Sequence, residues 1–210
     1  MVYVVESQLE EQRGNLGWVE NPAHSTKLAE RAARHALTID DPGANARAHV
    51  QLARVHILRG EHDLALAEAD RAIALNPSDT FIAEIRGGAL LWLGRFDEAI
   101  KLMESALRLD PVGRNSPVRH EIVLAYFAAE RYPQALAACE RALADHPYLP
   151  FLHLMRAAIL AQTGRIEEAR QSAAEVRRLQ PNFPVAEFGS RFVDPAPRVR
   201  LQAALRQAGL

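Results

Sequence analysis

The sequence predicts an all-α fold built from a short helical repeat. Prolines recur at nearly equal spacing along the chain, at Pro77, Pro111, Pro147 and Pro181. A segment of similar pattern leads to each proline and begins at the same distance before it, at Gly60, Gly94, Glu130 and Gly164. A nearly fixed period of about 34 residues indicates a stack of similar units, each of which contacts mainly its neighbours.

Each repeat is predicted to be a helix, a short turn and a second helix. Glycine at three of the turns fits a helix that ends in the left-handed conformation, which costs a residue with a Cβ about 1 kcal/mol. Glu130 occupies the fourth turn, so we expect that turn to close differently or to be strained. The recurring proline then ends the second helix. An acid or a proline suits the start of that helix, and the residues there are Asp63, Asp97, Pro133 and Glu167.

These signals divide the chain into four repeats and two terminal units. Residues 1–45 are predicted to be a degenerate first helix pair, with helices over 2–14 and from 22 to about 38 and a connection that contains Trp18. The repeats span residues 46–79, 80–113, 116–149 and 150–183, with a longer loop at 112–117. Residues 184–210 are predicted to be a truncated repeat, with a short helix at 185–192, and a capping helix from 198 to 208. The apolar side of the capping helix would consist of Val199, Leu201, Ala204 and Leu205.

Small residues at fixed places carry a resemblance to the tetratricopeptide repeat (TPR) family. One position of the second helix is alanine in all four repeats, at Ala65, Ala99, Ala135 and Ala169. Alanine there lets two helix backbones approach closely. The resemblance covers about residues 46–183. It implies a right-handed superhelix of antiparallel helix pairs, an α-solenoid of about four full repeats.

The two ends of the chain carry a second resemblance. The segments LGWVENPAHSTKLAERAARHALTIDD and RFVDPAPRVRLQAALRQAGL look like the ends of TPR regions that follow class III adenylate and guanylate cyclases in bacteria. Similar regions follow winged-helix regulatory domains. This resemblance implies a regulatory or self-association domain in bacterial signalling. The 210 residues leave no room for a cyclase domain beside the repeats, so no catalytic residue is assigned.

The first resemblance also implies where a partner would bind. In the TPR family the first helices line a concave groove, and here that groove would be apolar and aromatic in its middle, with arginines at one end. Exposed apolar stripes of this kind mark binding surfaces. The alternative is that some of these side chains pack within the array or against the chain's own terminus. The predicted partner-binding residues are Arg47, Val50, Arg54, Phe81, Glu84, Leu91, Trp92, His120, Leu124, Phe127, Phe151 and Leu154.

Composition argues against several classes of function. The 25 basic and 26 acidic residues give a net charge of −1, which indicates neither a nucleic-acid partner nor an anionic membrane. No run of 18 apolar residues occurs, and the N-terminus lacks the basic region of a signal peptide. The one cysteine, Cys139, cannot form an internal disulfide, which is compatible with the cytoplasm.

The sequence contains no nucleotide-binding, nucleophile-elbow or metalloprotease motif. Its eight histidines lack a cysteine or acid cluster at metal-ligand spacing. His56 occupies an aromatic position of the repeat and is predicted to be packed, and Cys139 is predicted to be a buried small apolar residue. We therefore expect no metal, no cofactor and no enzyme activity. The predicted function is a scaffold that binds a protein or peptide, and the alternative is a regulatory domain that forms homo-oligomers.

Overall fold

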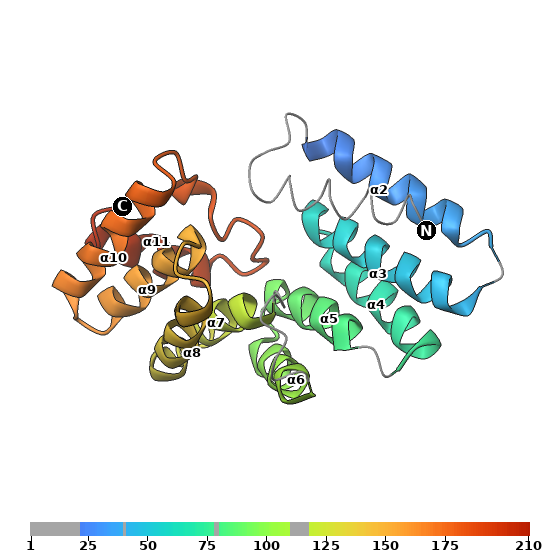
Figure 1. The fold of residues 1–210 in the computed structure, drawn as a ribbon, viewed down its shortest axis with the longest axis horizontal. Helices are drawn as coiled ribbons and strands as arrows, with labels where there is room; N and C mark the ends of the chain where they lie inside the picture. The colour runs from blue at the N-terminus through green and yellow to red at the C-terminus, as the bar shows by residue number, and fades with distance from the viewer. Residues whose placement is uncertain (1–21, 40, 78–79, 110–117) are drawn as a thin grey trace. The chain divides into compact units, whose positions relative to one another are not determined.

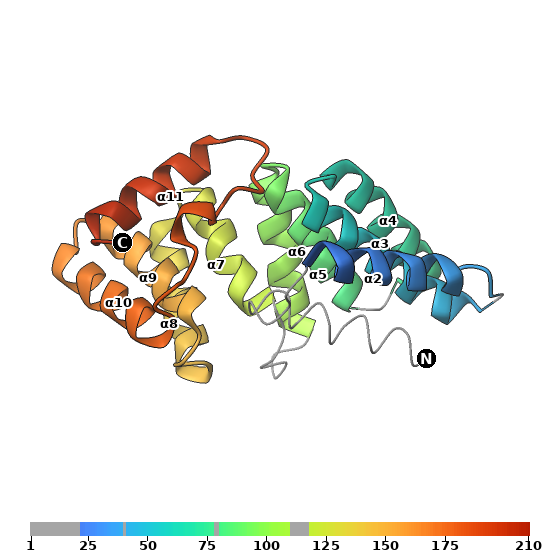
Figure 2. The same ribbon diagram turned by 90° about the horizontal axis from the view of Figure 1, so that it is seen from above.

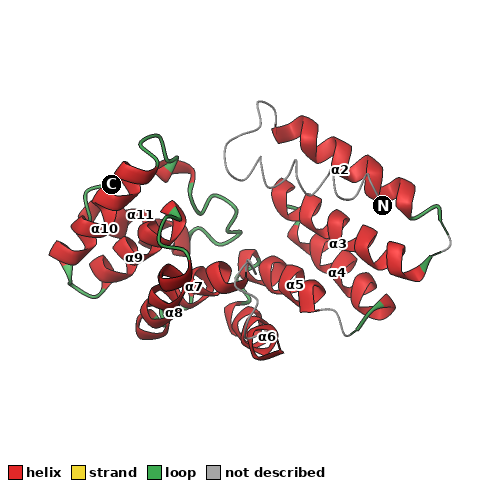
Figure 3. Ribbon diagram, viewed as in Figure 1, coloured by secondary structure: helices red, strands yellow, loops and turns green. Residues whose placement is uncertain are grey.

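The computed structural model describes residues 22–39, 41–77, 80–109 and 118–210, and it confirms the all-α class (Figures 1 and 3). Over these residues the chain forms helices, turns and loops, and no strand. They belong to two compact units, the first ending at Trp92 and the second beginning at Leu93, and each unit is described by itself. The predicted helix over 2–14, the connection containing Trp18 and the loop at 112–117 lie outside the described residues.

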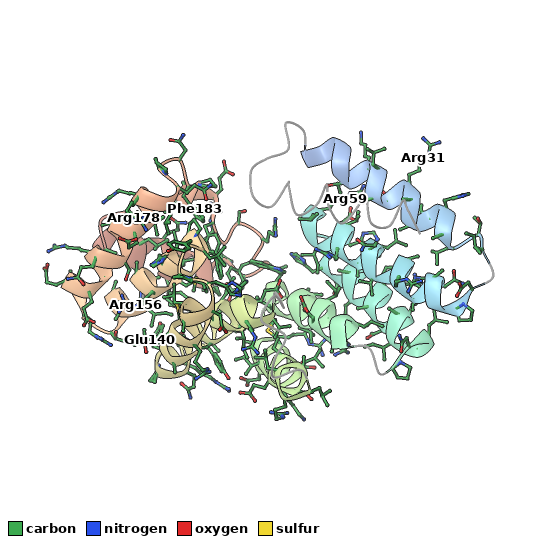
Figure 4. The ribbon with its side chains drawn as sticks, in the orientation of Figure 1. Arg31, Arg59, Glu140, Arg156, Arg178 and Phe183 are labelled. Atoms are coloured by element: carbon green, nitrogen blue, oxygen red, sulfur yellow. The ribbon has the colours of Figure 1, made fainter. Side chains whose placement is uncertain are left out.

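The first unit consists of helices that pack on their neighbours along the chain (Figure 1). Asp41 caps the second of them, because its Oδ1 accepts hydrogen bonds from the backbone N–H groups of Gly43 and Ala44 at 2.9 and 3.1 Å. An ion pair between Arg59 and Glu30 joins the end of this helix to the one before it (Figure 4). The helices are α2 (Pro22–Ala36), α3 (Pro42–Arg59), α4 (His62–Leu75) and α5 (Thr80–Trp92).

The second unit continues the alternation of first and second helices and ends in a different arrangement. Residues 185–192, predicted to be helical, form only the 3-10 helix η1 (Val185–Glu187), since Pro184 precedes it and Gly189 lies in the left-handed region at φ 80°. The last helix is α11 (Ala196–Gln207). The others are α6 (Phe96–Leu109), α7 (Val118–Ala128), α8 (Tyr132–Asp145), α9 (Pro150–Gln162) and α10 (Ile166–Leu179).

The four helix-to-helix turns lie where the repeat predicts them, and all four share one backbone conformation. Gly60, Gly94 and Gly164 have φ of 76°, 82° and 78°. Glu130 adopts the same conformation with φ 59°, and it is the one non-glycine residue with positive φ in the described part of the chain. The turn at Glu130 is therefore strained and does not close differently. Such a conformation costs a residue with a Cβ about 1–2 kcal/mol.

Alanine at the recurring position of the second helix is fully buried in all four repeats. Polar contacts between neighbouring helices supplement this packing. The Tyr126 hydroxyl of α7 donates to Glu104 of α6 at 2.6 Å, and burial, followed by that contact, raises the pKa of Tyr126 to about 12. Arg156 of α9 donates to the buried Ser172 of α10 at 2.9 Å (Figure 4). The helices are thus held at close range by small side chains and a few directed hydrogen bonds.

Two leucine substitutions on α6 test this packing. Ala99→Leu inserts a larger side chain where Ala99 is fully buried, and we expect it to lower the free energy of unfolding by about 1–3 kcal/mol. Lys101→Leu changes an exposed residue of the same helix and should stay within about 0.5 kcal/mol of wild type. Urea denaturation of both variants measures the difference. Equal urea midpoints would contradict the assigned register.

Candidate partner-binding surface

The predicted partner-binding residues of the first unit lie on its first helices, α3 and α5, which contact each other. Three of them are buried: Val50, Glu84 and Leu91. Val50 belongs to a core cluster that includes Ile82 and Ile85 of α5. Val50 thus packs between neighbouring first helices, and all three side chains are too buried to be presented to a partner.

The other predicted residues of the first unit retain accessible surface. Arg47 is exposed, and Arg54 and Trp92 are half-buried. Arg47 and Arg54 lie two helical turns apart on α3, on the same side of the helix. The side chain of Phe81 lies outside the described part of the structure.

In the second unit, three predicted partner-binding residues on α7 and α9 belong to the core. Leu124, Phe127 and Leu154 are buried, with Phe127 and Leu154 at 0% exposure. The ring of Phe127 packs edge-on against Tyr132 of α8, with ring centroids 5.6 Å apart. The sequence predicted these residues as partner-binding, with packing inside the array as the alternative, and their burial agrees with the alternative.

The remaining two predicted residues, His120 and Phe151, are half-buried. The ring of His120 lies edge-on to that of His146, with centroids 5.2 Å apart. Its Nε2 is buried and has no hydrogen-bond partner among the described residues. Burial, followed by the charges of His146 and Arg119, lowers the pKa of His120 to about 4. The site therefore favours a neutral imidazole.

Phe151 is covered by the chain itself. Residues 183–210, here called the C-terminal segment, lead from the end of α10 across the start of α9. The ring of Phe188 packs on Phe151 at 5.6 Å and on Phe183 at 6.3 Å between centroids. Phe183 is labelled in Figure 4. Further along, Phe192 meets Phe96 of α6 edge-on at 6.2 Å. An aromatic cluster of the chain's own terminus thus occupies this side of α9.

The helix of the C-terminal segment, α11, packs on α9 (Figure 2). Its buried side chains are spaced i, i+3, i+4 and i+7, which places them on one face of the helix. Val199, predicted to share that face, is instead 62% exposed, because it lies two residues from both of the buried residues Pro197 and Leu201 and so points another way. The buried residues are Pro197, Leu201, Ala204 and Leu205 of α11 and Ala208 directly after it, and the spacing named above is counted from Leu201.

The direction of α11 is opposite to that of a regular first helix. α9 and α10 form an antiparallel pair, so the end of α10 lies by the start of α9. Gln162, the last residue of α9, donates to the carbonyl of Arg200 near the start of α11 at 3.4 Å. Arg177, near the end of α10, donates to the carbonyl of Gly209 just after α11. α11 therefore runs antiparallel to α9, and it does not continue the repeat in register.

Arg200 joins α11 to the turn between α7 and α8. Its Nη2 donates to the carbonyl of Ala128, the last residue of α7, at 2.8 Å, and its Nη1 lies 3.4 Å from the Glu130 carboxylate. Burial and the charge of Glu130 raise the pKa of Tyr132, and Arg200 opposes this shift. We call the carbonyl of Ala128, the carboxylate of Glu130 and the side chain of Tyr132 the arginine site. A cation at the carbonyl end of a helix interacts favourably with the helix dipole.

Histidines of the first unit take part in hydrogen bonds within the fold. His56, predicted to be packed, is 9% exposed, and its Nδ1 lies 2.6 Å from Glu61. His49 Nδ1 lies 2.6 Å from Glu68, which also pairs with Arg71. Across the described part of the chain, no group of three or more histidine, cysteine or acidic side chains is arranged to hold a metal ion.

Cys139 is fully buried, as the sequence predicts. Its thiol donates to the carbonyl of Leu152 at 3.3 Å, and burial raises its pKa to about 12. The reactive form of cysteine is the thiolate, so a thiol in this environment is a poor nucleophile. Cys139 serves packing between α8 and α9.

The sequence did not reveal the arginine site or the aromatic contacts of Phe188. One signal was present, since glutamate replaces glycine at a turn that favours glycine. Nothing in the repeat pattern connects that glutamate to Arg200, which belongs to the last helix of the chain. Because Glu130 and Arg200 lie far apart in the sequence, the repeat pattern could not predict their contact.

Comparisons with known proteins agree with the repeat pattern. Residues 23–80 and the overlapping stretches 90–147 and 126–187 match family models described as Tetratricopeptide repeat. Human tetratricopeptide repeat protein 13 is 31% identical over 130 residues, which are 60% of this chain and 15% of that protein. Human FK506-binding protein-like is 31% identical over 96 residues, 45% of this chain and 28% of that protein. The chain thus spans less than a third of each relative's length.

Solved structures share the fold. A thermophilic TPR protein of Thermus thermophilus has a TM-score of 0.68 at 22% identity, covering 97% of this chain and 99% of that one. Pseudomonas aeruginosa PilF has a TM-score of 0.68 at 23% identity, with coverages of 99% and 87%. MamA has a TM-score of 0.59 at 17% identity, with coverages of 81% and 93%. At these identities the likeness establishes the TPR solenoid fold alone. Among the described helices, none is long and apolar enough to cross a membrane.

The lowered pKa of His120 predicts an acid-dependent loss of stability. The folded state holds this imidazole neutral down to about pH 4, whereas an unfolded histidine takes up its proton near pH 6.5. The contribution of neutral His120 to the free energy of unfolding is therefore complete above about pH 6.5 and is lost as the pH falls toward 4. We expect His120→Gln to show a smaller difference in free energy of unfolding between about pH 7.5 and pH 4.5 than wild type. His35→Gln, at an exposed histidine, is the control, and equal differences in wild type and His120→Gln would contradict the prediction.

Proposed function

The chain belongs to the tetratricopeptide repeat family, and we propose from this premise that it is a protein-interaction scaffold, not an enzyme. The observation that carries the proposal is the match of residues 23–80 and 90–187 to this family. Stacked helix pairs present extended surfaces suited to holding a segment of another protein. The single cysteine fits a reducing compartment, so we place the protein in the cytoplasm as part of this proposal.

We assign partner binding to the first helices of the first unit, α3 and α5. Arg47 and Arg54 bring two positive charges to one side of α3, and Trp92 ends α5 with a half-buried ring. Tryptophan and arginine are the residue types enriched among binding hot spots. The arginines would steer an acidic flank of the partner and act mainly on the association rate, while an apolar side chain would rest on Trp92. The expected ligand is an apolar segment with an acidic flank.

The alternative proposal is a regulatory or self-association domain of the kind that follows bacterial nucleotide cyclases or winged-helix regulators. It rests on the two end segments of the sequence alone. It differs from the scaffold proposal in one measurable property, because self-association requires a concentration-dependent homo-oligomer. Light scattering of the purified chain across a range of concentrations separates the two proposals.

Three variants of the first unit test the scaffold proposal. The wild-type chain is used to isolate a partner, and the dissociation constant of that purified partner is then measured. Trp92→Ala should raise the dissociation constant by about 30-fold or more, since truncating a central anchor typically costs about 2 kcal/mol. Arg47→Glu should slow association and reduce its dependence on salt.

Asp63→Ala, at an exposed residue of the second helix α4, is the matched control and should bind as wild type does. Thermal unfolding is measured on each variant. An equal loss of binding in Asp63→Ala would contradict the assignment to α3 and α5. A fall of many degrees in the melting temperature of Trp92→Ala would show that Trp92 serves the core.

A further inference from the structure

The C-terminal segment contacts α9 in the manner of a bound ligand. An amphipathic helix that binds a groove on another protein is anchored by apolar side chains at i, i+3, i+4 and i+7. Leu201, Ala204, Leu205 and Ala208 have this spacing, and each is 2% exposed or less. Because α11 runs antiparallel to α9, its anchors meet first-helix positions without continuing the repeat. Phe188 and the carbonyl of Arg200, both in the C-terminal segment, contact Phe151 and Gln162 near the two ends of α9.

The C-terminal segment is also folded on itself. Gln202 of α11 donates to the carbonyls of Val185 and Phe188 at 2.7 and 3.1 Å, and Arg198 donates to the carbonyl of Ala186 at 3.0 Å. Gly189 lies against Arg198 and Leu201, where a Cβ would come within 3.6 Å of both side chains. These contacts hold residues 183–193 to α11, so the segment forms one body that packs on α9 and reaches the end of α7 through Arg200.

The arginine site gives that body a specific contact with the repeats. Arg200 immediately precedes the first anchor, Leu201, and reaches the carbonyl end of α7. Its partner Glu130 stands in a left-handed conformation that glycine adopts at the other three turns. A turn residue chosen for the turn alone would be glycine. The carboxylate that Glu130 supplies to Arg200 distinguishes this turn from the other three.

The contact of Arg200 with the arginine site is weak. The Nε of Arg200 is buried and has no hydrogen-bond partner among the described residues, which weakens the seated state. Both Arg200 and Glu130 keep part of their surface in solvent, at 28% and 59% exposure, so salt screens their attraction. The covalent tether supplies a high effective concentration, which together with the apolar anchors keeps the segment in place.

We propose that the first-helix surface of α7 and α9 is a binding site for an amphipathic helix. The chain's own residues 183–210 occupy this site at rest. Arg200, bound in the arginine site, is the contact by which the helix is recognised. The matching partner is a helix with apolar anchors at i, i+3, i+4 and i+7 and an arginine directly before the first anchor. This inference rests on the proposed function only for the existence of such a partner. It concerns the second unit, whereas the proposed function was assigned to the first.

Glu130→Gly in the full chain tests the recognition contact. The substitution removes the strain of the turn and also the carboxylate. We expect the turn to remain intact, while hydrogen exchange of the α11 amides speeds up by up to about fivefold relative to wild type and that of α8 and α9 amides stays unchanged. Glu130→Gln, which keeps the strain and removes the charge, should also speed exchange in α11. If Glu130 served only the turn, neither variant would change exchange in α11.

The matched control is Glu168→Gln at the next turn. It breaks the exposed pair between Arg165 and Glu168, at 2.6 Å, which does not involve the C-terminal segment. Exchange of the α11 amides should match wild type in this variant. Faster exchange there would show that α11 responds to any loss of surface charge, and it would overturn the assignment.

A synthetic peptide of residues 183–210, fluorescently labelled, tests whether the surface accepts a helix in trans. The full chain with Arg200→Ala keeps the arginine site but holds its own segment less tightly. We expect it to bind the peptide at least about tenfold more tightly than wild type does, because the peptide brings the missing arginine. A peptide carrying Arg200→Ala should lose this gain. Arg200→Lys is the milder variant should thermal unfolding show that Arg200→Ala is not folded.

Three outcomes would overturn the proposal. In the first, the wild-type and Arg200→Ala chains bind the intact peptide equally well, although the α11 amides exchange faster in Arg200→Ala than in wild type. Another is unchanged α11 exchange in Arg200→Ala. The third is a wild-type dimer that the peptide dissociates, since the resting occupant would then be the segment of a second copy. None of these depends on whether a partner binds α3 and α5, so the two proposals fail separately.

Discussion

The close approach of neighbouring helices at the recurring alanines is the constraint on which the rest of the structure depends. Where Ala65, Ala99, Ala135 and Ala169 are fully buried, no larger side chain separates the helices. Side chains near these contacts are consequently enclosed, even where the repeat pattern would place them at a surface. The same tight spacing leaves little adjustable volume, because protein interiors are packed as densely as organic crystals. The side chains available for contact with another molecule are therefore the few that stay outside this packing.

The helices could be predicted from the sequence because their determinants are local. Glycine at the turns and proline after the second helices act within a few residues, and the observed helices end close to those positions. The exposure of Phe127 and Leu154 could not be predicted in the same way. Their exposure depends on how closely neighbouring helices pack and on where residues 183–210 bind. The repeat pattern predicts neither. An apolar residue on a first helix has the same spacing whether it faces solvent or another helix.

Glu130 shows how one position can satisfy two demands in conflict. The turn favours glycine because a residue with a Cβ is strained at φ 59°. Arg200 favours a carboxylate at this place, since the guanidinium already faces the carbonyl end of α7. Glu130 stands 3.4 Å from that guanidinium, and both side chains keep part of their surface in solvent. The glutamate is therefore understandable as a residue of the contact with α11 that happens to stand in a turn.

Two interactions of different strength hold the C-terminal segment, namely the apolar anchors of α11 and the ion pair of Arg200 with Glu130. In the proposal above, the first lets the segment act as a cap and the second lets it act as a ligand. Burying a leucine side chain contributes about 1.5–3 kcal/mol, so Leu201 and Leu205 bind α11 firmly to α9. The exposed pair of Arg200 and Glu130 adds about 0–1 kcal/mol to the binding of α11. Its main effect is on how α11 is oriented, not on how tightly α11 is bound. A terminal repeat needs its apolar face covered, and any amphipathic helix of suitable spacing would meet that need. What an arginine at the carbonyl end of α7 adds is selectivity among such helices, and selectivity has a use only where more than one helix competes for the surface.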